Sequence, residues 1–280
     1  MHYSLFLVLS LFLQHARFAQ SVRPYNRIPI LTVNEYKSAW HSADNRLILL
    51  DNDGVLLPQH GRNDHDVKKA QDLLEALARD PKNTVWVITA RGFDHVQEQY
   101  RVLRDRKVRL NLAGQLGTES RKWSEDTVRI QEGARDDVAA LHRSLVEATG
   151  ATFMPRNCCI LYPKNKGQND KLVLKEMQRL AGDFTFEPNS GDHATLTHPT
   201  INKGGFARDL FEKHERKTFV MSFGDADIDE KMHEAVNNSG FQTAVSTYVN
   251  TNGQSAARTR LDSHHDVHRF FREMVGPEWF

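Results

Sequence analysis

Short apolar runs alternate with amphipathic stretches along the first half of this chain. Residues 46–50, 84–88 and 108–112 are largely apolar, and each run ends in a turn sequence. Runs of this length and composition are typical of buried parallel strands. Residues 64–80 and 93–104, which separate the runs, carry apolar side chains at helical spacing. The alternation of strand and helix predicts an α/β fold built on a doubly wound parallel sheet.

The same alternation returns near the C-terminus after an interruption. From residue 202 the pattern predicts, in order, a helix at 204–214, a strand at 219–223, a helix at 229–236, a strand at 241–245 and a helix at 266–274. Residues 119–198 instead combine helices with short strands, which indicates a small inserted α+β domain. The predicted organisation is therefore a core of residues 21–118 and 199–280 around an inserted domain of residues 119–198.

The N-terminus is compatible with two compartments. Residues 3–13 form an apolar run, and the small residues Ala16 and Ala19 follow it. This length suits a signal peptide over residues 1–20 and is too short to span a bilayer. No Lys or Arg precedes the run, however, so an ordinary apolar helix is the alternative. No later segment is apolar enough to span a membrane.

Charge and cysteine content exclude several classes of function. The 280 residues include 37 basic and 36 acidic side chains, with a net charge of +1. That balance offers no electrostatic footprint for nucleic acid or for an anionic membrane. The two cysteines, Cys158 and Cys159, are adjacent, which gives neither a disulfide framework nor a zinc-binding spacing. The 14 histidines are scattered, and most are interpreted as surface residues.

Polar residues gather where the predicted strands end. The turns at 51–54, 89–92 and 114–117 each follow a strand. Right-handed crossovers bring the carboxyl ends of parallel strands to one edge of the sheet, which is where ligands bind in folds of this class. We therefore expect the three turns to converge on one site.

The first turn holds two carboxylates, Asp51 and Asp53. One can attack phosphorus, while the other protonates the leaving oxygen and later activates water. The sequence Asp-x-Asp-Gly also occurs in calcium loops, but no Glu closes a twelve-residue loop here. The pair therefore favours phosphoryl transfer through a covalent intermediate.

Other strand ends supply groups for a phosphate and a metal. Thr89 and Arg91 follow the second strand and can hold phosphoryl oxygens, although Thr89 could equally be a helix cap. Lys203 precedes a helix and can neutralise phosphate, although alone it would be interpreted as a surface lysine. Asp225 and Asp229 lie four residues apart at a helix start, and either carboxylate could bind Mg²⁺ or simply cap the helix.

Taken together and in this order, these residues resemble the haloacid dehalogenase superfamily of aspartate-nucleophile phosphatases. The resemblance implies that Asp51 is the nucleophile, that Asp53 is the acid and base, and that Thr89, Arg91 and Lys203 bind phosphate. It also implies a Mg²⁺ cofactor. The expected ligands of this ion are Asp51, the main-chain carbonyl of Asp53 and Asp225, with Asp229 in a supporting role.

Longer stretches resemble the fungal trehalose-6-phosphate phosphatases. Residues 112–119 are similar to Leu-Ala-Gly-Asn-His-Gly-x-Glu of that family, and residues 224–232 to Gly-Asp-Asp-x-Thr-Asp-Glu-x-Met. Residues 255–261 resemble the family's Ser-x-Ala-x-Tyr-x-Leu tail, and the likeness extends over about residues 27–275. The resemblance implies that the insert after the third strand is a C2-type cap domain. It also implies that a sugar phosphate is the substrate.

The chain departs from the family mostly in the cap. Leu161-Tyr-Pro163 stands where the family has His-Tyr-Arg, and Leu196-Thr-His-Pro199 where it has Glu-x-Arg-Pro. Because those family residues touch the sugar, replacement contacts are expected from other residues of this chain. The candidates for these contacts are Lys164, Asn165, Glu187 and His198, and Gly114 and Gly117 in the core are further substrate candidates. The core also departs from the family at Asn52, Val55 and Ala226.

The expected reaction is hydrolysis of trehalose 6-phosphate to trehalose and phosphate. The departures leave two alternatives open: a phosphatase of the same superfamily acting on another sugar phosphate, and a non-catalytic regulatory subunit of a trehalose synthase complex. A trehalose-6-phosphate synthase is a possible partner in either case. The family resemblance implies a cytoplasmic location, whereas a signal peptide would imply secretion.

Overall fold

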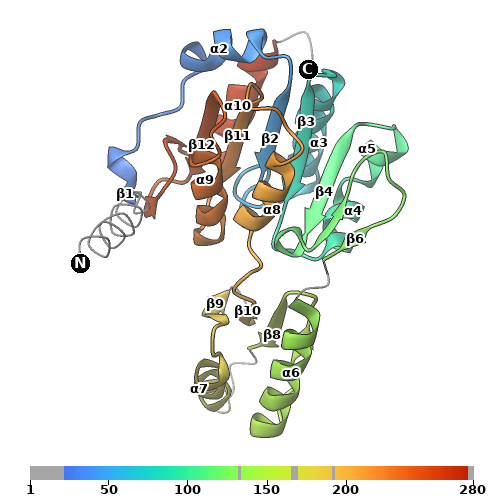
Figure 1. The fold of residues 1–280 in the computed structure, drawn as a ribbon, viewed down its shortest axis with the longest axis vertical. Helices are drawn as coiled ribbons and strands as arrows, with labels where there is room; N and C mark the ends of the chain where they lie inside the picture. Colours follow the sequence, from blue (N-terminus) through green and yellow to red (C-terminus); the bar gives the residue numbers. More distant parts are fainter. Residues whose placement is uncertain (1–21, 132–133, 165–169, 191–192, 277–280) are drawn as a thin grey trace, which may run out of the picture.

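An eight-stranded sheet organises the larger lobe of the molecule (Figure 1). The computed structural model of the chain describes residues 22–131, 134–164, 170–190 and 193–276. The sheet has the strand order β14-β12-β11-β2-β3-β4-β5-β6. Its parallel strands are β2 (Arg46–Leu50), β3 (Asn83–Ile88), β4 (Leu110–Gly114), β11 (Phe219–Gly224), β12 (Thr243–Val249) and β14 (Thr259–Leu261).

Helices cover both faces of this sheet, as expected for a doubly wound fold. Side chains of a strand alternate between the faces, so Ile48 and Leu50 pack on one side of β2 while Leu47 and Leu49 pack on the other. The first face is covered by α2 (Val33–Ser42), α3 (Asp64–Arg79), α4 (Phe93–Gln99), α5 (Arg101–Asp105) and α10 (His264–Val275). The second is covered by α8 (Lys203–Phe211) and α9 (Glu230–Asn237).

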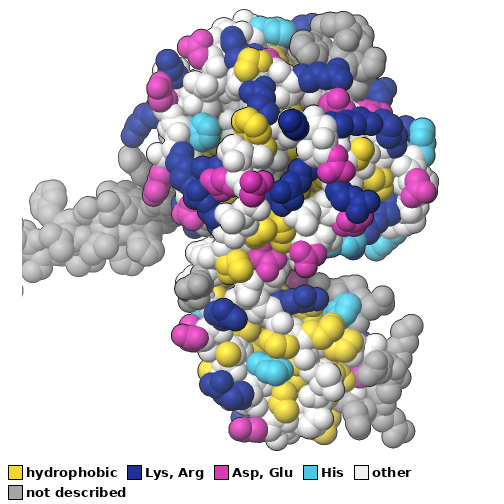
Figure 2. Space-filling view, turned by 90° about the vertical axis from the view of Figure 1, so that its right-hand side faces the viewer, with side chains coloured by type: hydrophobic (Ala, Val, Ile, Leu, Met, Phe, Trp, Pro, Cys, Tyr) yellow, Lys and Arg dark blue, Asp and Glu magenta, His cyan; other side chains and the backbone are white. Residues whose placement is uncertain are grey.

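The smaller lobe is an α+β unit joined to the larger lobe by a narrow neck (Figures 1 and 2). Its antiparallel sheet has the strand order β7-β8-β10-β9. Leu145, Ile160 and Met177 belong to a hydrophobic core of its own. Its elements are α6 (Arg135–Thr149), β7 (Met154–Pro155), β8 (Cys159–Pro163), α7 (Asp170–Leu180), β9 (Thr185–Ser190) and β10 (His193–Thr197).

The inserted lobe begins later than the sequence predicts. Strands β5 (Glu119–Arg121) and β6 (Arg129–Ile130) pair antiparallel with β4 and with each other, so they extend the core sheet. These strands are short and polar, and so they lack the apolar run by which the other core strands are recognised. The boundary predicted at residue 119 therefore needs correction, because residues 119–130 belong to the sheet of the larger lobe.

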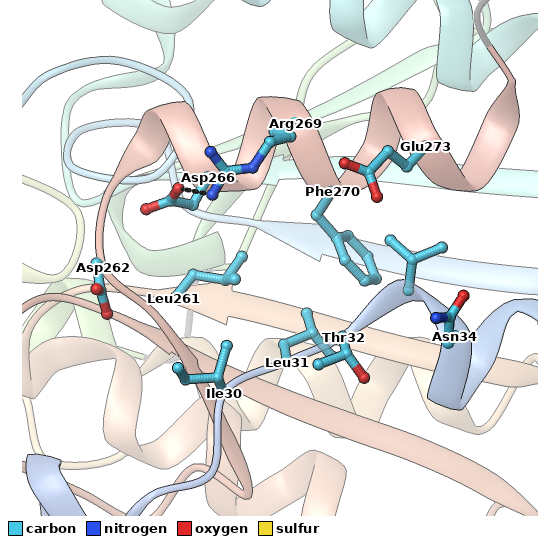
Figure 3. A pocket seen from close by; sticks show the side chains of 11 residues that line it. Ile30, Leu31, Thr32, Asn34, Leu261, Asp262, Asp266, Arg269, Phe270 and Glu273 are labelled. Carbon is cyan, nitrogen blue, oxygen red and sulfur yellow. Dashed lines mark hydrogen bonds and ion pairs between the residues drawn. The ribbon is translucent and has the colours of Figure 1, made fainter.

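The segment before α2 packs along the C-terminal part of the core. β1 (Arg23–Pro24) pairs with β13 (Gln254–Ser255), and the 3₁₀ turn η1 (Tyr25–Arg27) follows. Leu31 is buried, and its N–H donates to the carbonyl of Arg260 at 2.9 Å. A hollow of about 370 Å³ lies between this segment and α10, with Leu31 and Phe270 on its wall (Figure 3). Residues 22–45 are thus packed onto the core.

Two further expectations concern compartment and cysteine chemistry. No helix of the described residues is both long and apolar enough for a membrane span. The signal peptide predicted for residues 1–20 lies outside the described residues. Cys158 and Cys159 are both free thiols, and Cys158 is buried.

Candidate active site

Asp51 lies at the carboxyl end of β2, a central strand between β11 and β3. Its backbone N–H donates to the carbonyl of Phe223 at 3.0 Å, which fixes the first residue beyond the strand. The residue is only 5% exposed. The side chain therefore starts at the sheet edge where ligands bind in open α/β folds.

Lys203, the first residue of α8, is fully buried against Asp51. Its Nζ lies 2.6 Å from Asp51 Oδ1 and 2.6 Å from Asp229 Oδ1. Burial alone would lower the pKa of Lys203, but the charges of Asp229 and Asp51 outweigh burial and raise it above its usual value. The lysine is therefore a charged ammonium held between two carboxylates, as the sequence-based interpretation requires.

Asp229 positions the surrounding groups. Its Oδ2 accepts hydrogen bonds from the backbone N–H groups of Asp225, at 3.0 Å, and Ala226, at 3.2 Å. Its Oδ1 accepts from Lys203. Because both oxygens are already engaged, Asp229 fits the supporting role expected for it.

Asp225 completes a buried acidic group suited to a metal ion. Carboxylate oxygens of Asp51, Asp225 and Asp229 lie within 4.8 Å of one another. Gly54 makes room for Asp225: it has a φ of 84°, and a Cβ at this position would lie 2.1 Å from Asp225 Oδ2. Carboxylate oxygens are the ligands that Mg²⁺ prefers, so the donor set fits the predicted cofactor.

Lys203 can balance only one of the three carboxylate charges in this group. Burial raises the pKa of Asp51 to about 7, although Lys203 opposes the shift. Burial, with the nearby charges of Asp51 and Asp229, raises the pKa of Asp225 to about 8. A divalent cation would favour the ionised form of both carboxylates and so lower their pKa values.

The stability of the metal-free protein is expected to fall as the pH rises from about 4 to about 8. In this window Asp51 and Asp225 bind more protons in the folded protein than in the unfolded chain, because their folded pKa values are raised to about 7 and about 8. Rising pH therefore favours unfolding. Mg²⁺ should raise the melting temperature more near pH 8 than near pH 5, which thermal unfolding with Mg²⁺ or with a chelator will measure.

Asp225→Asn is the control for this pH dependence. It removes one of the two titrating carboxylates, so the stabilisation by Mg²⁺ should become smaller and less dependent on pH. A Mg²⁺ effect of the same size at every pH would contradict the assignment of Asp51 and Asp225 to the metal site.

Thr89 lies where the sequence predicts a phosphate contact. It is buried and directly follows β3, the neighbour of β2. Its Oγ1 accepts a hydrogen bond from the backbone N–H of Arg91 at 3.1 Å. That bond leaves the hydroxyl proton available to donate to a phosphoryl oxygen.

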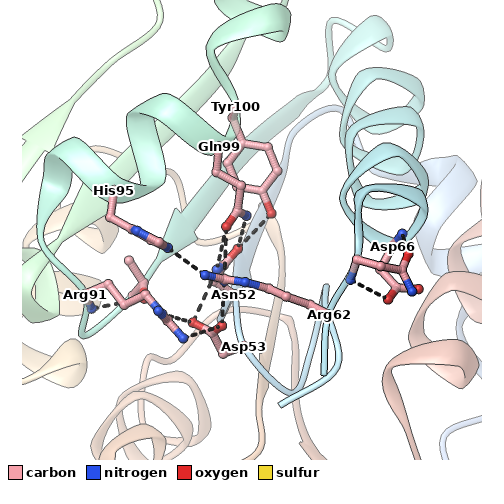
Figure 4. Close-up of polar contacts among 10 residues, drawn as sticks. Asn52, Asp53, Arg62, Asp66, Arg91, His95, Gln99 and Tyr100 are labelled. Atoms are coloured by element: carbon pink, nitrogen blue, oxygen red, sulfur yellow. Dashed lines mark hydrogen bonds and ion pairs between the residues drawn. The ribbon is translucent and has the colours of Figure 1, made fainter. Parts of the chain in front are cut away.

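Arg91 contacts the second carboxylate of the first turn. Its guanidinium forms two contacts with Asp53, from Nε to Oδ2 at 2.7 Å and from Nη2 to Oδ1 at 3.0 Å (Figure 4). The two residues follow neighbouring parallel strands, so their side chains meet at the same sheet edge. In this structure, Arg91 is thus a partner of the predicted acid and base, and its contact with phosphate stays a prediction.

Gly114 and Gly117 have a structural explanation. A Cβ on Gly114 would lie 2.5 Å from the backbone N of Phe93. Gly117 has a φ of 103°, and its Cβ would lie 2.5 Å from the side chain of Phe206. Glycine is thus required here by close packing, and neither residue offers a side chain to a substrate.

The cap candidates separate into different environments. Glu187 on β9 is half-buried, and burial followed by the charge of Asp227 raises its pKa, so this part of the cap lies near the Asp225–Asp229 loop. His198 is 8% exposed and lies within hydrogen-bonding distance of Thr200 and Asp137, which gives it a structural role at the neck. Lys164 donates to the carbonyl of Pro188 at 3.2 Å. Asn165, a further cap candidate, lies outside the described residues.

Asn157 in the cap contacts Gln115 and Glu119 in the core, and these contacts were not predicted from the sequence. Asn157 donates from its backbone N–H to Gln115 Oε1 at 3.0 Å and from Nδ2 to Glu119 Oε1 at 2.7 Å. The signal was present in the Gly-Gln-Leu-Gly-Thr-Glu stretch, whose glutamate also accepts from the backbone N–H of Phe93.

The sheet and its covering helices form a haloacid dehalogenase-like fold. A haloacid dehalogenase-like hydrolase from Bacteroides thetaiotaomicron has this fold, with a TM-score of 0.59 at 14% identity over 82% of this chain and 99% of that one. The chain belongs to the trehalose-phosphatase family, whose sequence model matches residues 49–265. This confirms the family predicted from the sequence.

Individual relatives agree with the family assignment. Trehalose-phosphatase of Schizosaccharomyces pombe is 25% identical over 225 residues, which are 74% of this chain and 26% of that protein. The chain thus spans about a quarter of the length of the curated relatives it matches. The trehalose-6-phosphate phosphatase of Aspergillus fumigatus superposes with a TM-score of 0.65 at 21% identity, covering 89% of this chain and 99% of that structure.

Proposed function

We propose that this protein is a Mg²⁺-dependent sugar-phosphate phosphatase that hydrolyses trehalose 6-phosphate to trehalose and phosphate. The observation that carries the proposal is the buried contact of Asp51 with Lys203, beside Asp225 and two residues before Asp53. Membership of the trehalose-phosphatase family supports a phosphoric monoester hydrolase. The names of the relatives support this particular sugar.

The reaction begins with attack by Asp51. A carboxylate oxygen of Asp51 forms a bond to phosphorus, and the bond from phosphorus to the sugar oxygen breaks. Asp53 gives its proton to that oxygen, so the sugar leaves as an alcohol. Lys203 and the hydroxyl of Thr89 stabilise the charge on the transferred phosphoryl group.

Water completes the turnover. Asp53, now a carboxylate, takes a proton from the water that attacks phosphorus of the aspartyl-phosphate. Phosphate leaves, the carboxylate of Asp51 is restored, and Asp53 again holds a proton for the next cycle. A magnesium ion held by Asp51 and Asp225 would supply positive charge beside the phosphate throughout.

The cap is proposed to select the sugar. It is inserted between β6 and α8, so it is connected to the core directly before Lys203. Glu187 is the cap candidate best supported, since the charge of Asp227 in the core contributes to its raised pKa. Closure of the cap would exclude bulk water from the aspartyl-phosphate. Association with a trehalose-6-phosphate synthase remains a further proposal, suggested by the names of plant relatives.

A substrate panel tests this proposal. Purified protein with Mg²⁺ should release phosphate from trehalose 6-phosphate with a kcat/KM at least about tenfold above that for sucrose 6-phosphate or glucose 6-phosphate, a discrimination of about 1.4 kcal/mol that differing sugar contacts can supply. Turnover of aryl phosphates without this preference would retain the chemistry of Asp51 and change the substrate. Absence of turnover on every compound would favour the regulatory subunit.

A further inference from the structure

The carboxylate of Asp53 receives four hydrogen-bond donors (Figure 4). Oδ1 accepts from Arg91 at 3.0 Å and from Arg62 at 3.2 Å. Oδ2 accepts from Arg91 at 2.7 Å and from Asn52 Nδ2 at 3.3 Å. Each oxygen therefore has two donors in different directions, which restrains the rotation of the carboxylate.

Arg62 connects Asp53 to helix α4, which follows β3. Besides Asp53, its Nη1 donates to Gln99 Oε1 at 3.4 Å. Its Nη2 lies 3.1 Å from His95 Nε2, and because a guanidinium has no acceptor, His95 must accept this bond. Burial and the charges of Arg91 and Arg62 lower the pKa of His95, which keeps its ring neutral and able to accept. One guanidinium thus contacts three side chains at once.

Buried side chains hold Gln99, the partner of Arg62, in place. Asn52 is fully buried, and its Oδ1 accepts from Tyr100 Oη at 2.7 Å and from Gln99 Nε2 at 2.9 Å. Tyr100 is itself buried in the core. Asn52, one of the departures from the family in the core, therefore holds Gln99 in the orientation that receives Arg62.

We propose that Arg62 is a positioning residue for proton transfer by Asp53. The inference rests on the proposed function and adds to it a residue outside the motifs from which that function was derived. Arg91 donates to both oxygens of Asp53, and its side chain is 42% exposed. Arg62, which is 29% exposed, approaches Oδ1 separately and is held by Gln99 and His95. When Asp53 gives its proton to the leaving oxygen, it becomes the carboxylate that these donors hold, so Arg62 stabilises and orients that carboxylate as the proton is transferred.

Leaving-group dependence separates this role from a structural one. A leaving group that is already a good anion, such as 4-nitrophenolate, needs little protonation, whereas phenolate and a sugar alkoxide need more. The parameter to compare is kcat/KM, because it reports formation of the aspartyl-phosphate and excludes its later hydrolysis. Phenyl phosphate, 4-nitrophenyl phosphate and trehalose 6-phosphate form the test series.

Arg62→Gln should lower kcat/KM for phenyl phosphate and trehalose 6-phosphate at least about tenfold more than for 4-nitrophenyl phosphate, since a positioned acid contributes about 10²- to 10⁴-fold. Arg62→Lys keeps the positive charge but lacks the planar set of donors, so its kcat/KM values should lie between those of Arg62→Gln and those of the unmodified protein. The matched control is Arg106→Gln. Arg106 directly follows α5 and pairs with Glu75 at 3.0 Å, so this substitution should leave kcat/KM for all three substrates unchanged.

Equal losses on all substrates, or no loss on any, would overturn the inference. Thermal unfolding of each variant shows whether the fold is intact, and the Arg62→Lys series provides the answer if Arg62→Gln does not fold. Failure of the proposed function looks different, because the unmodified protein would then turn over none of the three substrates, or only the two aryl phosphates, which still allow the comparison of leaving groups.

Discussion

Asp51→Asn is expected to abolish phosphate release, with a loss in kcat on the order of 10⁴- to 10⁶-fold, as found when a covalent nucleophile is removed. Asparagine has almost the same shape but cannot form the acyl-phosphate bond. The fold should survive, because Asp51 is buried in a place that raises its pKa to about 7 and a neutral amide meets no such penalty. The measurement is phosphate release with Mg²⁺ at saturating substrate, with thermal unfolding recorded on the same sample.

Asp72→Asn is the matched control for this substitution. Asp72 is an exposed aspartate on α3 that pairs with Lys68 on the same helix, so its loss should leave turnover unchanged. Retention of activity in Asp51→Asn would remove Asp51 from the mechanism. Loss of activity in both variants would point to a general defect of the preparation.

Lys203→Met is expected to cause the largest loss of stability, about 3 to 5 kcal/mol, the usual effect of removing one partner of a buried ion pair. Lys203 is fully buried, and its Nζ lies 2.6 Å from both Asp51 and Asp229. Methionine fills similar volume, but it leaves these carboxylates and nearby Asp225 with no cation. Urea unfolding in the presence of a chelator measures the effect without compensation by a metal.

A second substitution distinguishes lost charge from lost packing. In the Lys203→Met background, Asp229→Asn removes one of the uncompensated charges and should recover part of the stability. Lys231→Met is the surface control: Lys231 is 60% exposed and pairs with Glu234 at 2.9 Å, so little change is expected. A loss below about 1 kcal/mol in Lys203→Met would show that the buried pair is not a main support of the site.

The central strands were predictable because they are buried on both faces. β2 matches the predicted residues 46–50, and β3 and β11 each differ by one residue at one end. β4 runs from Leu110 to Gly114, so it begins and ends two residues later than the predicted strand at 108–112. β5 and β6 were missed because they are short and mostly polar, and so carry no apolar run.

The site was predictable where topology alone determines it. Asp51, Lys203, Asp225 and Asp229 each lie at a strand end or a helix start, and parallel strands bring those ends together. The pairing of Arg91 with Asp53 was not predictable in this way, since the choice between a phosphate and a carboxylate depends on side-chain distances. The contacts of His198 with Asp137 and Thr200 were not predictable either, and its contact with the sugar stays a prediction.

The most direct test of the central claim is to trap the covalent intermediate. The protein would be mixed with Mg²⁺ and trehalose 6-phosphate or an aryl phosphate, quenched in acid within milliseconds and digested, and the peptides analysed by mass spectrometry. A phosphoryl group is expected on Asp51 and should be absent from the Asp51→Asn variant. Phosphate release without any phosphorylated aspartate, or with the phosphoryl group on another residue, would contradict it.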